Sequence, residues 1–348
     1  MKHRIFTTSE AAWIEMLRDI SSAKKNIYFE MYILADDPAG SRFFAELARA
    51  AERGVRVAVI LDIVGSYDIL SSAVARLRAS GAEVIFSSFF FRRSHRKILI
   101  IDETVAFIGG VNVGKKYARW RDLQIRVGGR VVGSILRSFA RMYRKCGGKG
   151  EINHGRARYG VVGKTRLWFI ERGFGRRRHL FRKYYEERFD GARKSIVFVT
   201  PYLFPPRWLI ASIHQALIRG VEVEILLPKS TDHWIINDGI NRSFASCLTN
   251  LGAKIYFISG MNHAKAMLVD GREGVIGSQN LDIISFNWNV EAGVFFHEPD
   301  MVRDLAAIIR GWKGPAKPFS SKIYGIFFQW YDIPTAFFLR LFGFLPLD

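Results

Sequence analysis

The sequence is poor in two features that mark whole classes of protein, cysteine and long apolar runs. Its 348 residues contain two cysteines, Cys146 and Cys247, far apart and outside any CxxC or Cys/His spacing. They predict neither a zinc site nor a disulfide framework, and a reducing, cytoplasmic setting is the default. No apolar run reaches the roughly 18 to 20 residues that span a bilayer, and MKHRIFTTSEAAW lacks the apolar region of a signal peptide. We therefore expect neither secretion nor a transmembrane helix.

Acidic residues are scarce relative to basic ones. The 52 Lys and Arg exceed the 32 Asp and Glu by 20. A surplus of this size favours polyanionic partners such as nucleic acid, anionic lipid headgroups or phosphorylated substrates, and charge alone does not choose among them. The length allows one large domain or two of ordinary size.

The chain carries an internal duplication. Four stretches recur in the same order with offsets of 166 to 171 residues, beginning at Asn26, Ala45, Ser80 and Ser94 and recurring at Ser195, Ala211, Leu251 and Asn262. Such recurrence indicates two fused copies of one unit. We predict an N-terminal repeat over residues 1–150, a C-terminal repeat over 151–312 and a tail over 313–348, with the Gly-rich residues 146–160 as a linker.

Each repeat begins with a strand, helix, strand pattern. A β-branched and aromatic run precedes an amphipathic segment such as FFAELARAAERG, and an apolar run follows, VRVAVILD or VEVEILLP. This order predicts an α/β fold of two fused repeats, each a mixed, mostly parallel β-sheet flanked by helices, related by a pseudo-two-fold axis. Residues 229–250 are expected to form a helix or a lid.

The strongest match between the repeats is the pattern H-x-K-x4-D-x6-G-(G/S)-x-N. It aligns His95, Lys97, Asp102, Gly109, Gly110 and Asn112 with His263, Lys265, Asp270, Gly277, Ser278 and Asn280. A lone His beside a Lys is usually a solvated pair, but surface positions diverge freely after duplication, so the kept pattern predicts a catalytic site. Asp102 and Asp270 belong to this pattern, and because they end their strands we expect them to act structurally, by ion pairing or turn capping.

The HxK segment opens a buried strand, so the His and Lys of each repeat point to one face while Arg96 or Ala264 points to the other. If the repeats pack about a two-fold axis, one pocket holds two imidazoles and two ammonium groups, which suits a phosphate. The predicted phosphate-binding residues are Asn112, Asn280, Gly110 and Ser278. We expect no metal and no cofactor, because the lysines supply the positive charge.

Two histidines facing a phosphate suggest a division of labour. One attacks phosphorus to give a phosphohistidine, while the other protonates the leaving alkoxide and then deprotonates the incoming alcohol or water. Each needs a carboxylate on its other ring nitrogen. Asp122 follows His95 by 27 residues and Glu291 follows His263 by 28, and this matching separation makes the two acids the best candidates.

These residues resemble a known family. The two copies of HxKxxxxD with trailing GG-x-N and GS-x-N are the signature of the phospholipase D superfamily, and FIGGVNVGKKYARWRDLQIRVGG, TPYLFPP and GSQNLDIISFNWNVEAG look like bacterial cardiolipin synthases. The resemblance covers nearly the whole chain. It implies a phosphatidyltransferase that forms a covalent phosphatidyl-histidine and passes the phosphatidyl group to a second phosphatidylglycerol, releasing glycerol.

The resemblance also implies roles for single residues. His95 matches the family's usual nucleophile and His263 its general acid/base, although the near symmetry of the motifs leaves that assignment open. The family's phosphate binders and orienting acids fall on Lys97, Lys265, Asn112, Asn280, Asp122 and Glu291.

Membrane contact is expected outside any transmembrane segment, which many cardiolipin synthases have at their N-terminus and this sequence lacks. Phe89, Phe90 and Phe91 stand beside two arginines, an apolar wedge with a basic collar, with a buried strand end as the alternative. The tail is rich in Phe and includes Trp330, a further predicted contact, with a core-covering helix pair as the alternative. We expect a peripheral protein of the cell inner membrane, on its cytoplasmic face.

Other functions fit parts of the sequence. A phospholipase D hydrolase shares every catalytic residue, and a nuclease of the superfamily suits the charge. Nucleic acid is nevertheless disfavoured as a partner, because its grooves need spaced stacking rings rather than FFF or IFFQWY. An inactive lipid-binding scaffold is the alternative outside enzymes. The expected partners are anionic phospholipids such as phosphatidylglycerol and the membrane surface, and no dimer is needed to complete the site.

Overall fold

A computed structural model describes residues 3–69, 71–89, 92–152, 166–175, 179–232 and 234–320. Phe90, Phe91, Trp330 and most of the predicted tail lie outside these ranges.

The first repeat forms a seven-stranded sheet with the strand order β1-β7-β6-β5-β2-β3-β4. Its strands are β1 (Arg4–Thr8), β2 (Asn26–Met31), β3 (Arg56–Asp62), β4 (Glu83–Ser87), β5 (Lys97–Ile101), β6 (Val105–Gly109) and β7 (Arg121–Gly128). Its helices are α1 (Ser9–Ser22), α2 (Pro38–Glu52), α3 (Ser71–Ala79), the short 3-10 helix η1 (Lys115–Tyr117) and α4 (Arg130–Lys145).

The second repeat forms a seven-stranded sheet with the order β8-β16-β14-β13-β9-β11-β12. Its strands are β8 (Leu167–Arg172), β9 (Ser195–Val199), β11 (Glu222–Pro228), β12 (Lys254–Ile258), β13 (Ala266–Val269), β14 (Glu273–Gly277) and β16 (Glu291–Phe296), and a separate pair joins β10 (Leu203–Phe204) to β15 (Leu281–Asp282). Its helices are α5 (Leu180–Gly191), α6 (Arg207–Ile218), α7 (Trp234–Asn250), α8 (Ile283–Asn287) and α9 (Pro299–Lys313).

The two strand orders correspond one to one, which confirms the predicted α/β fold of two fused repeats with mixed sheets. The expectation of mostly parallel sheets is wrong. In each sheet only the last three strands of the order pair in parallel, and the other neighbours are antiparallel. A strand buried on both faces shows an apolar run whatever its direction, so the sequence pattern could not reveal the hairpins that follow each HxK strand.

Helix α2 shows how local sequence sets an element. Asp37 Oδ1 accepts hydrogen bonds from the N–H groups of Ala39 and Gly40 at 2.8 and 3.1 Å, and Pro38 occupies the first helical turn. These are typical start signals of a helix. Phe43 and Leu47, four residues apart, are buried against the sheet.

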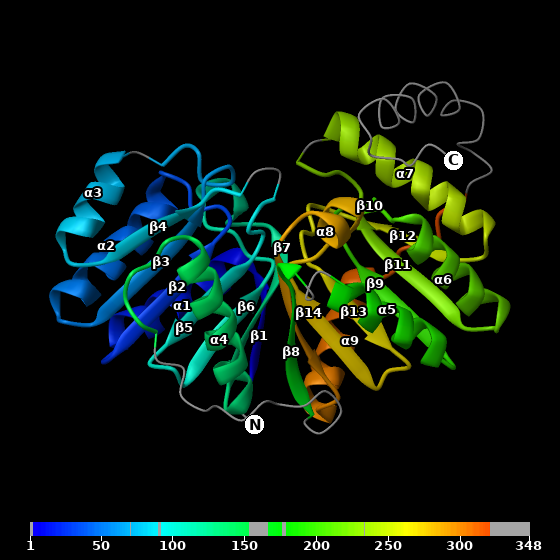
Figure 1. Cartoon of the computed structure of the whole chain (residues 1–348). Helices are drawn as coiled ribbons and strands as arrows, with labels where there is room; N and C mark the ends of the chain where they lie inside the picture. Colours follow the sequence, from blue (N-terminus) through cyan, green and yellow to red (C-terminus); the bar gives the residue numbers. More distant parts are fainter. Residues whose placement is uncertain are drawn as a thin grey trace.

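The two sheets lie side by side, and β6 and β7 of the first pack against β14 and β16 of the second (Figure 1). Helices α1, α2 and α3 cover the outer face of the first sheet, and α5, α6 and α7 that of the second. Helices α4 and α9 share one apolar core with the inner faces of both sheets. The repeats are therefore joined by buried surface.

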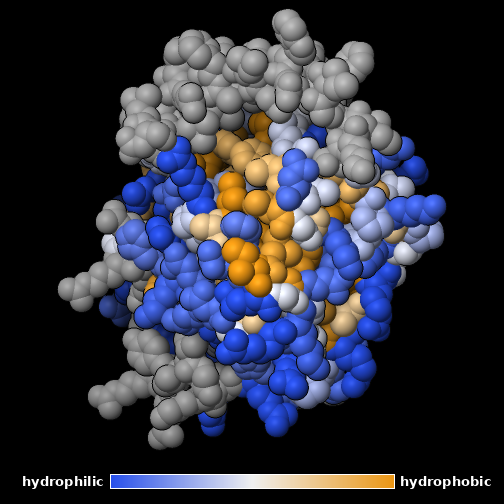
Figure 2. All heavy atoms as spheres, turned by 90° about the vertical axis from the view of Figure 1, so that its right-hand side faces the viewer, coloured by the Kyte–Doolittle hydropathy of each residue, from blue (hydrophilic) through white to orange (hydrophobic). Residues whose placement is uncertain are grey.

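The outer side of the second repeat carries exposed apolar residues. Figure 2 shows apolar atoms gathered near the middle of this face, and the exposed large side chains in α6 and α7 include Ile218 and Ile236. Within the described ranges, none of the helices combines the length and apolar character needed to cross a bilayer.

Candidate active site

The two HxK segments meet at the seam between the repeats. The His95 N–H donates to the carbonyl oxygen of Val290 at 3.0 Å, and the His263 N–H donates to that of Arg121 at 2.7 Å. Val290 and Arg121 are the residues that directly precede Glu291 and Asp122. Backbone pairing thus places the acid of each repeat beside the histidine of the other.

Each histidine is held by the carboxylate of the opposite repeat. His95 Nδ1 lies 3.0 Å from Glu291 Oε1, and His263 Nδ1 lies 2.7 Å from Asp122 Oδ2. Because a carboxylate only accepts hydrogen bonds, Nδ1 carries the proton in both rings and Nε2 keeps its lone pair when the ring is neutral. The predicted acids are therefore brought to the histidines, but in crossed pairs rather than within one repeat.

Burial sets the protonation of both rings. It lowers the pKa of His95 to about 4, against the opposing effect of Glu291. Burial also lowers the pKa of His263 to about 4, helped by the charge of Lys265 and opposed by Asp122. Burial raises the pKa of Glu291, but His95, Lys97 and Ser278 outweigh it and the net shift is downward. At neutral pH the site holds two neutral imidazoles, and Glu291 is ionised.

The two lysines lie beneath the histidines. Lys97 Nζ donates to the carbonyl oxygen of its own His95 at 2.6 Å, and Lys265 Nζ donates to that of His263. Both side chains are buried, 0% and 1% exposed. Burial lowers the pKa of Lys265 to about 8 and that of Lys97 well below its usual range. The protonated form of each lysine is therefore disfavoured by desolvation, and a bound anion would stabilise it.

A cavity of about 390 Å³ opens above this pair, and both histidines line it. Asn112 and Asn280 line it as well, and among the described residues their buried Oδ1 atoms have no hydrogen-bond partner. An amide can be turned so that its NH2 group faces the cavity instead. Both asparagines are therefore placed to bind a polar ligand, and phosphate binding stays a prediction.

Gly110 and Ser278, predicted as phosphate binders, contact the two orienting acids. A methyl group on Gly110 would lie 2.3 Å from Asp122 Oδ1, so glycine is required for the close approach of that carboxylate. The Ser278 hydroxyl donates to Glu291 Oε2. Both positions thus support the orienting acids, and their binding of phosphate stays a prediction.

Asp102 and Asp270 lie away from the cavity, at the far ends of the HxK strands. Asp102 accepts hydrogen bonds from the backbone N–H groups of Lys24, Lys25 and Asn26, and Asp270 does the same for residues 193–195. Both have left-handed φ angles, 48° and 52°. Their place in the catalytic pattern thus reflects a turn that ties two strands together, and their carboxylates do not reach the cavity.

Phe89, predicted to contact the membrane, is half-buried. Its ring lies edge-on to that of Phe174, with a centroid separation of 4.8 Å, and packs against the shared core. This packing covers part of the ring, and membrane contact by Phe89 stays a prediction. Phe90, Phe91 and Trp330 lie outside the described residues.

Sequence reasoning missed a pair of tyrosines beside the histidines. The ring centroids of Tyr32 and His95 are 4.7 Å apart, and those of Tyr202 and His263 are 6.3 Å apart. Both tyrosines follow the first strand of the strand, helix, strand unit, in NIYFEMY and SIVFVTPY. A single inserted residue hides the match, which a gapped comparison of the repeats could have found.

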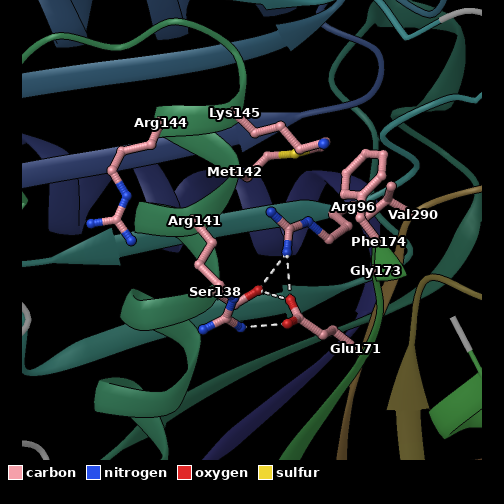
Figure 3. Close-up of a pocket in the computed structure, with 10 residues that line it drawn as sticks. All are labelled: Arg96, Ser138, Arg141, Met142, Arg144, Lys145, Glu171, Gly173, Phe174 and Val290. Atoms are coloured by element: carbon pink, nitrogen blue, oxygen red, sulfur yellow. Dashed lines mark hydrogen bonds and ion pairs between the residues drawn. The ribbon is translucent and has the colours of Figure 1, made fainter. Parts of the chain in front are cut away.

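A second cavity, of about 270 Å³, lies on the opposite side of the HxK strand. Arg96 points there, as strand alternation predicts, and donates to Ser138 of α4 at 2.5 Å and to Glu171 of β8 at 3.2 Å (Figure 3). Its guanidinium also forms a two-pronged contact with Glu30 of β2, at 2.9 and 2.5 Å. Arg96 therefore ties both repeats together directly behind His95.

Comparison with known families identifies a protein family that matches both repeats. A family profile described as "Cardiolipin synthase, PLD-like domain" matches residues 16–140 and 185–312, one segment in each repeat. The chain belongs to this family. Each matched segment includes one HxK motif and the acid that orients the histidine of the other repeat.

Curated relatives agree with the profile. A cardiolipin synthase of Oceanobacillus iheyensis is 31% identical over 319 residues, and one of Listeria monocytogenes is 30% identical over 322 residues. Each alignment covers 86% of this chain and 66% of the relative, so the chain spans about two thirds of their length. The crystal structure of phosphatidylserine synthase from Haemophilus influenzae matches the fold with a TM-score of 0.73, at 16% identity, over 91% of this chain and 87% of that chain.

Proposed function

We propose that the chain is a phosphatidyltransferase of the cardiolipin synthase type, acting through a phosphohistidine. The observation that supports it most is that two imidazoles line one cavity, each held at Nδ1 by a carboxylate of the other repeat. In this mechanism Nε2 of His95 attacks the phosphorus of phosphatidylglycerol. The N–P bond forms as the P–O bond to glycerol breaks, and Glu291 compensates the positive charge of the phosphorylated ring.

His263 handles the protons in this mechanism. The lysine charges that help to lower its pKa are offset when a phosphodiester anion binds, so His263 takes up a proton in the complex. It gives that proton to the departing glycerol oxygen and then removes one from the incoming hydroxyl of a second phosphatidylglycerol. Attack of this oxygen on phosphorus releases His95 and completes cardiolipin.

We place this activity at a membrane surface, because both substrates are phospholipids. The net charge of +20 supports attraction to anionic headgroups. We propose peripheral association with the cytoplasmic face of the inner membrane, and one chain suffices because both histidines and both acids belong to it.

The test is to incubate the protein with labelled phosphatidylglycerol vesicles and separate the lipids. We expect cardiolipin and free glycerol in equal amounts. Phosphatidic acid without cardiolipin would instead indicate a hydrolase, and intact lipid together with cleavage of added DNA would contradict any lipid activity.

The covalent step has its own test. With a phosphatidyl donor whose leaving group needs no proton, such as a nitrophenol ester, His263→Gln should retain a labelled phosphatidyl group on the protein, because the base for the second step is missing. His95→Gln is the matched control and should remain unlabelled. The opposite labelling pattern would assign the nucleophile to His263.

A further inference from the structure

The two ends of the active-site cavity differ in chemistry. At the His95 end, the Arg93 guanidinium donates to the Tyr32 hydroxyl at 3.2 Å, and both residues line the cavity. At the His263 end, the Tyr202 hydroxyl donates to Asp232 Oδ1 at 2.6 Å, and both of these line it too. A cation thus marks the first end and a carboxylate the second.

The carboxylate end is built around His263. The ring centroids of Trp120 and Tyr202 lie 5.5 and 6.3 Å from that of His263. Asn237, from the first turns of α7, lines the cavity and is half-buried. The Thr231 N–H donates to Asp238 Oδ1 at 2.8 Å, which holds this part of α7 beside Asp232. A carboxylate and an amide at one end of a cavity are acceptors and donors suited to neighbouring hydroxyl groups.

The charges around Asp232 favour a neutral polyol over an amine. Lys116 Nζ lies 4.0 Å from Asp232 Oδ2, so the charge of the carboxylate already has a counter-ion. Lys97 and Lys265 lie beneath the histidines and would repel an ammonium group. Hydroxyl groups can donate to Asp232 without adding positive charge.

We propose that Asp232 and Asn237 form a subsite for the vicinal hydroxyls of a glycerol headgroup, beside His263. This inference rests on the proposed function and adds where its alcohols bind. The subsite is used twice in each cycle. It first holds the glycerol that leaves as the P–O bond breaks and takes a proton from His263. It then holds the secondary hydroxyl at the glycerol end of the second lipid, while the primary hydroxyl returns a proton to His263 as its oxygen bonds to phosphorus and the N–P bond to His95 breaks.

An exchange assay isolates the subsite. Phosphatidylglycerol vesicles are incubated with the protein and either labelled glycerol or labelled ethanol, and label incorporated into lipid is measured. Both alcohols react with the same phosphohistidine, but ethanol has no second hydroxyl for Asp232. We expect Asp232→Asn and Asn237→Ala to lower the ratio of glycerol to ethanol incorporation by about tenfold or more. The exposed Asp300→Asn, on α9, is the matched carboxylate control and should keep the ratio.

The ratio is internally normalised, since a folding defect would lower both incorporations together. An unchanged ratio in Asp232→Asn and Asn237→Ala, with cardiolipin still formed by the wild type, would overturn the subsite and leave the proposed function intact. If the wild-type protein incorporates neither alcohol and makes no cardiolipin, the proposed function itself fails, and the subsite with it.

Discussion

At the scale of single residues, the crossed pairing of histidines and acids determines the chemistry of the site. Each ring receives its orienting carboxylate from the opposite repeat, at 3.0 Å for His95 and 2.7 Å for His263. The duplicated pattern pointed to all four residues, because the two repeats of one sequence can be compared with each other. It could not reveal the crossing, since equal separations along the sequence describe either pairing.

The crossing is testable by titrating the rings with NMR. Asp122 raises the pKa of His263, so Asp122→Asn should lower that pKa further below about 4. Glu291→Gln should do the same to His95, whose pKa Glu291 raises. Each variant should shift its crossed partner more than the histidine of its own repeat. A larger shift within one repeat would contradict the pairing.

The low pKa values also predict how activity depends on pH. In the proposed mechanism His95 attacks as a neutral ring and His263 is protonated in the complex, whereas both rings are neutral in the free protein. The kcat/KM for phosphatidylglycerol should therefore rise about tenfold per unit as the pH falls from 8 to 5, and decline below the pKa of about 4. A histidine with its ordinary pKa of 6.5 would begin that decline near neutral pH. A pH-rate profile of the wild-type protein distinguishes the two.

The same depression of pKa makes folding less favourable in acid. Between pH 6.5 and about 4 the unfolded chain binds a proton at His263 and the folded chain does not, so this residue's contribution to stability is lost as the pH falls. The unfolding free energy of His263→Gln, measured by urea denaturation, should therefore fall less steeply over this window than that of the wild type. Parallel curves would count against a buried neutral ring.

At the scale of elements, the two faces of the first HxK strand have different surroundings. Its His and Lys face the active-site cavity, while Arg96 reaches Glu30, Ser138 and Glu171 on the other side. Alternation along a strand predicted the two faces. The carboxylates that meet Arg96 could not be predicted, because they come from β2 and β8, which the sequence places far apart.

Removing Arg96 should destabilise the protein strongly. Arg96→Met leaves Glu30 and Glu171 buried without their shared cation, at a cost of about 3 to 5 kcal/mol in unfolding free energy. Arg144→Met, at an exposed neighbouring position in α4, should change it by less than about 0.5 kcal/mol. Denaturant unfolding of both variants gives the comparison, and equal effects would contradict the structural role of Arg96.

The two turn aspartates should behave as a matched pair. Asp102→Asn and Asp270→Asn keep the left-handed turn but weaken hydrogen bonds from three backbone N–H groups, so each should cost about 1 to 2 kcal/mol. The kcat of each folded variant should stay within about threefold of the wild type, because neither side chain lines the cavity. A loss of a hundredfold or more with unchanged stability would place these acids in the reaction.

At the scale of the whole molecule, charge and duplication could be predicted from the sequence, and the direction of most strands could not. Four stretches recur in the same order at nearly equal offsets, and this was enough to predict two repeats. Each repeat was then expected to form its own sheet. The hairpin strands of each sheet have apolar runs, which are the same whether a strand pairs in parallel or antiparallel. The proportion of parallel and antiparallel pairs is therefore seen only in the structure.

The net charge of +20 predicts how the protein binds membranes. Sedimentation with phosphatidylglycerol vesicles should recover most of the protein at 50 mM salt and much less at 500 mM, because salt screens headgroup attraction. Neutral phosphatidylcholine vesicles are the control and should recover little at either salt concentration. Equal recovery with both lipids at high salt would show that apolar contact dominates.

The exchange of acids between the repeats has a consequence for how such a chain could arise. A single ancestral unit contains one histidine and one acid that cannot meet, so it could have worked only as a symmetric pair of identical subunits. Two units joined in one chain need not be symmetric. Arg96 and Ala264, which stand at equivalent positions, differ, and the cavity has a cation at one end and a carboxylate at the other.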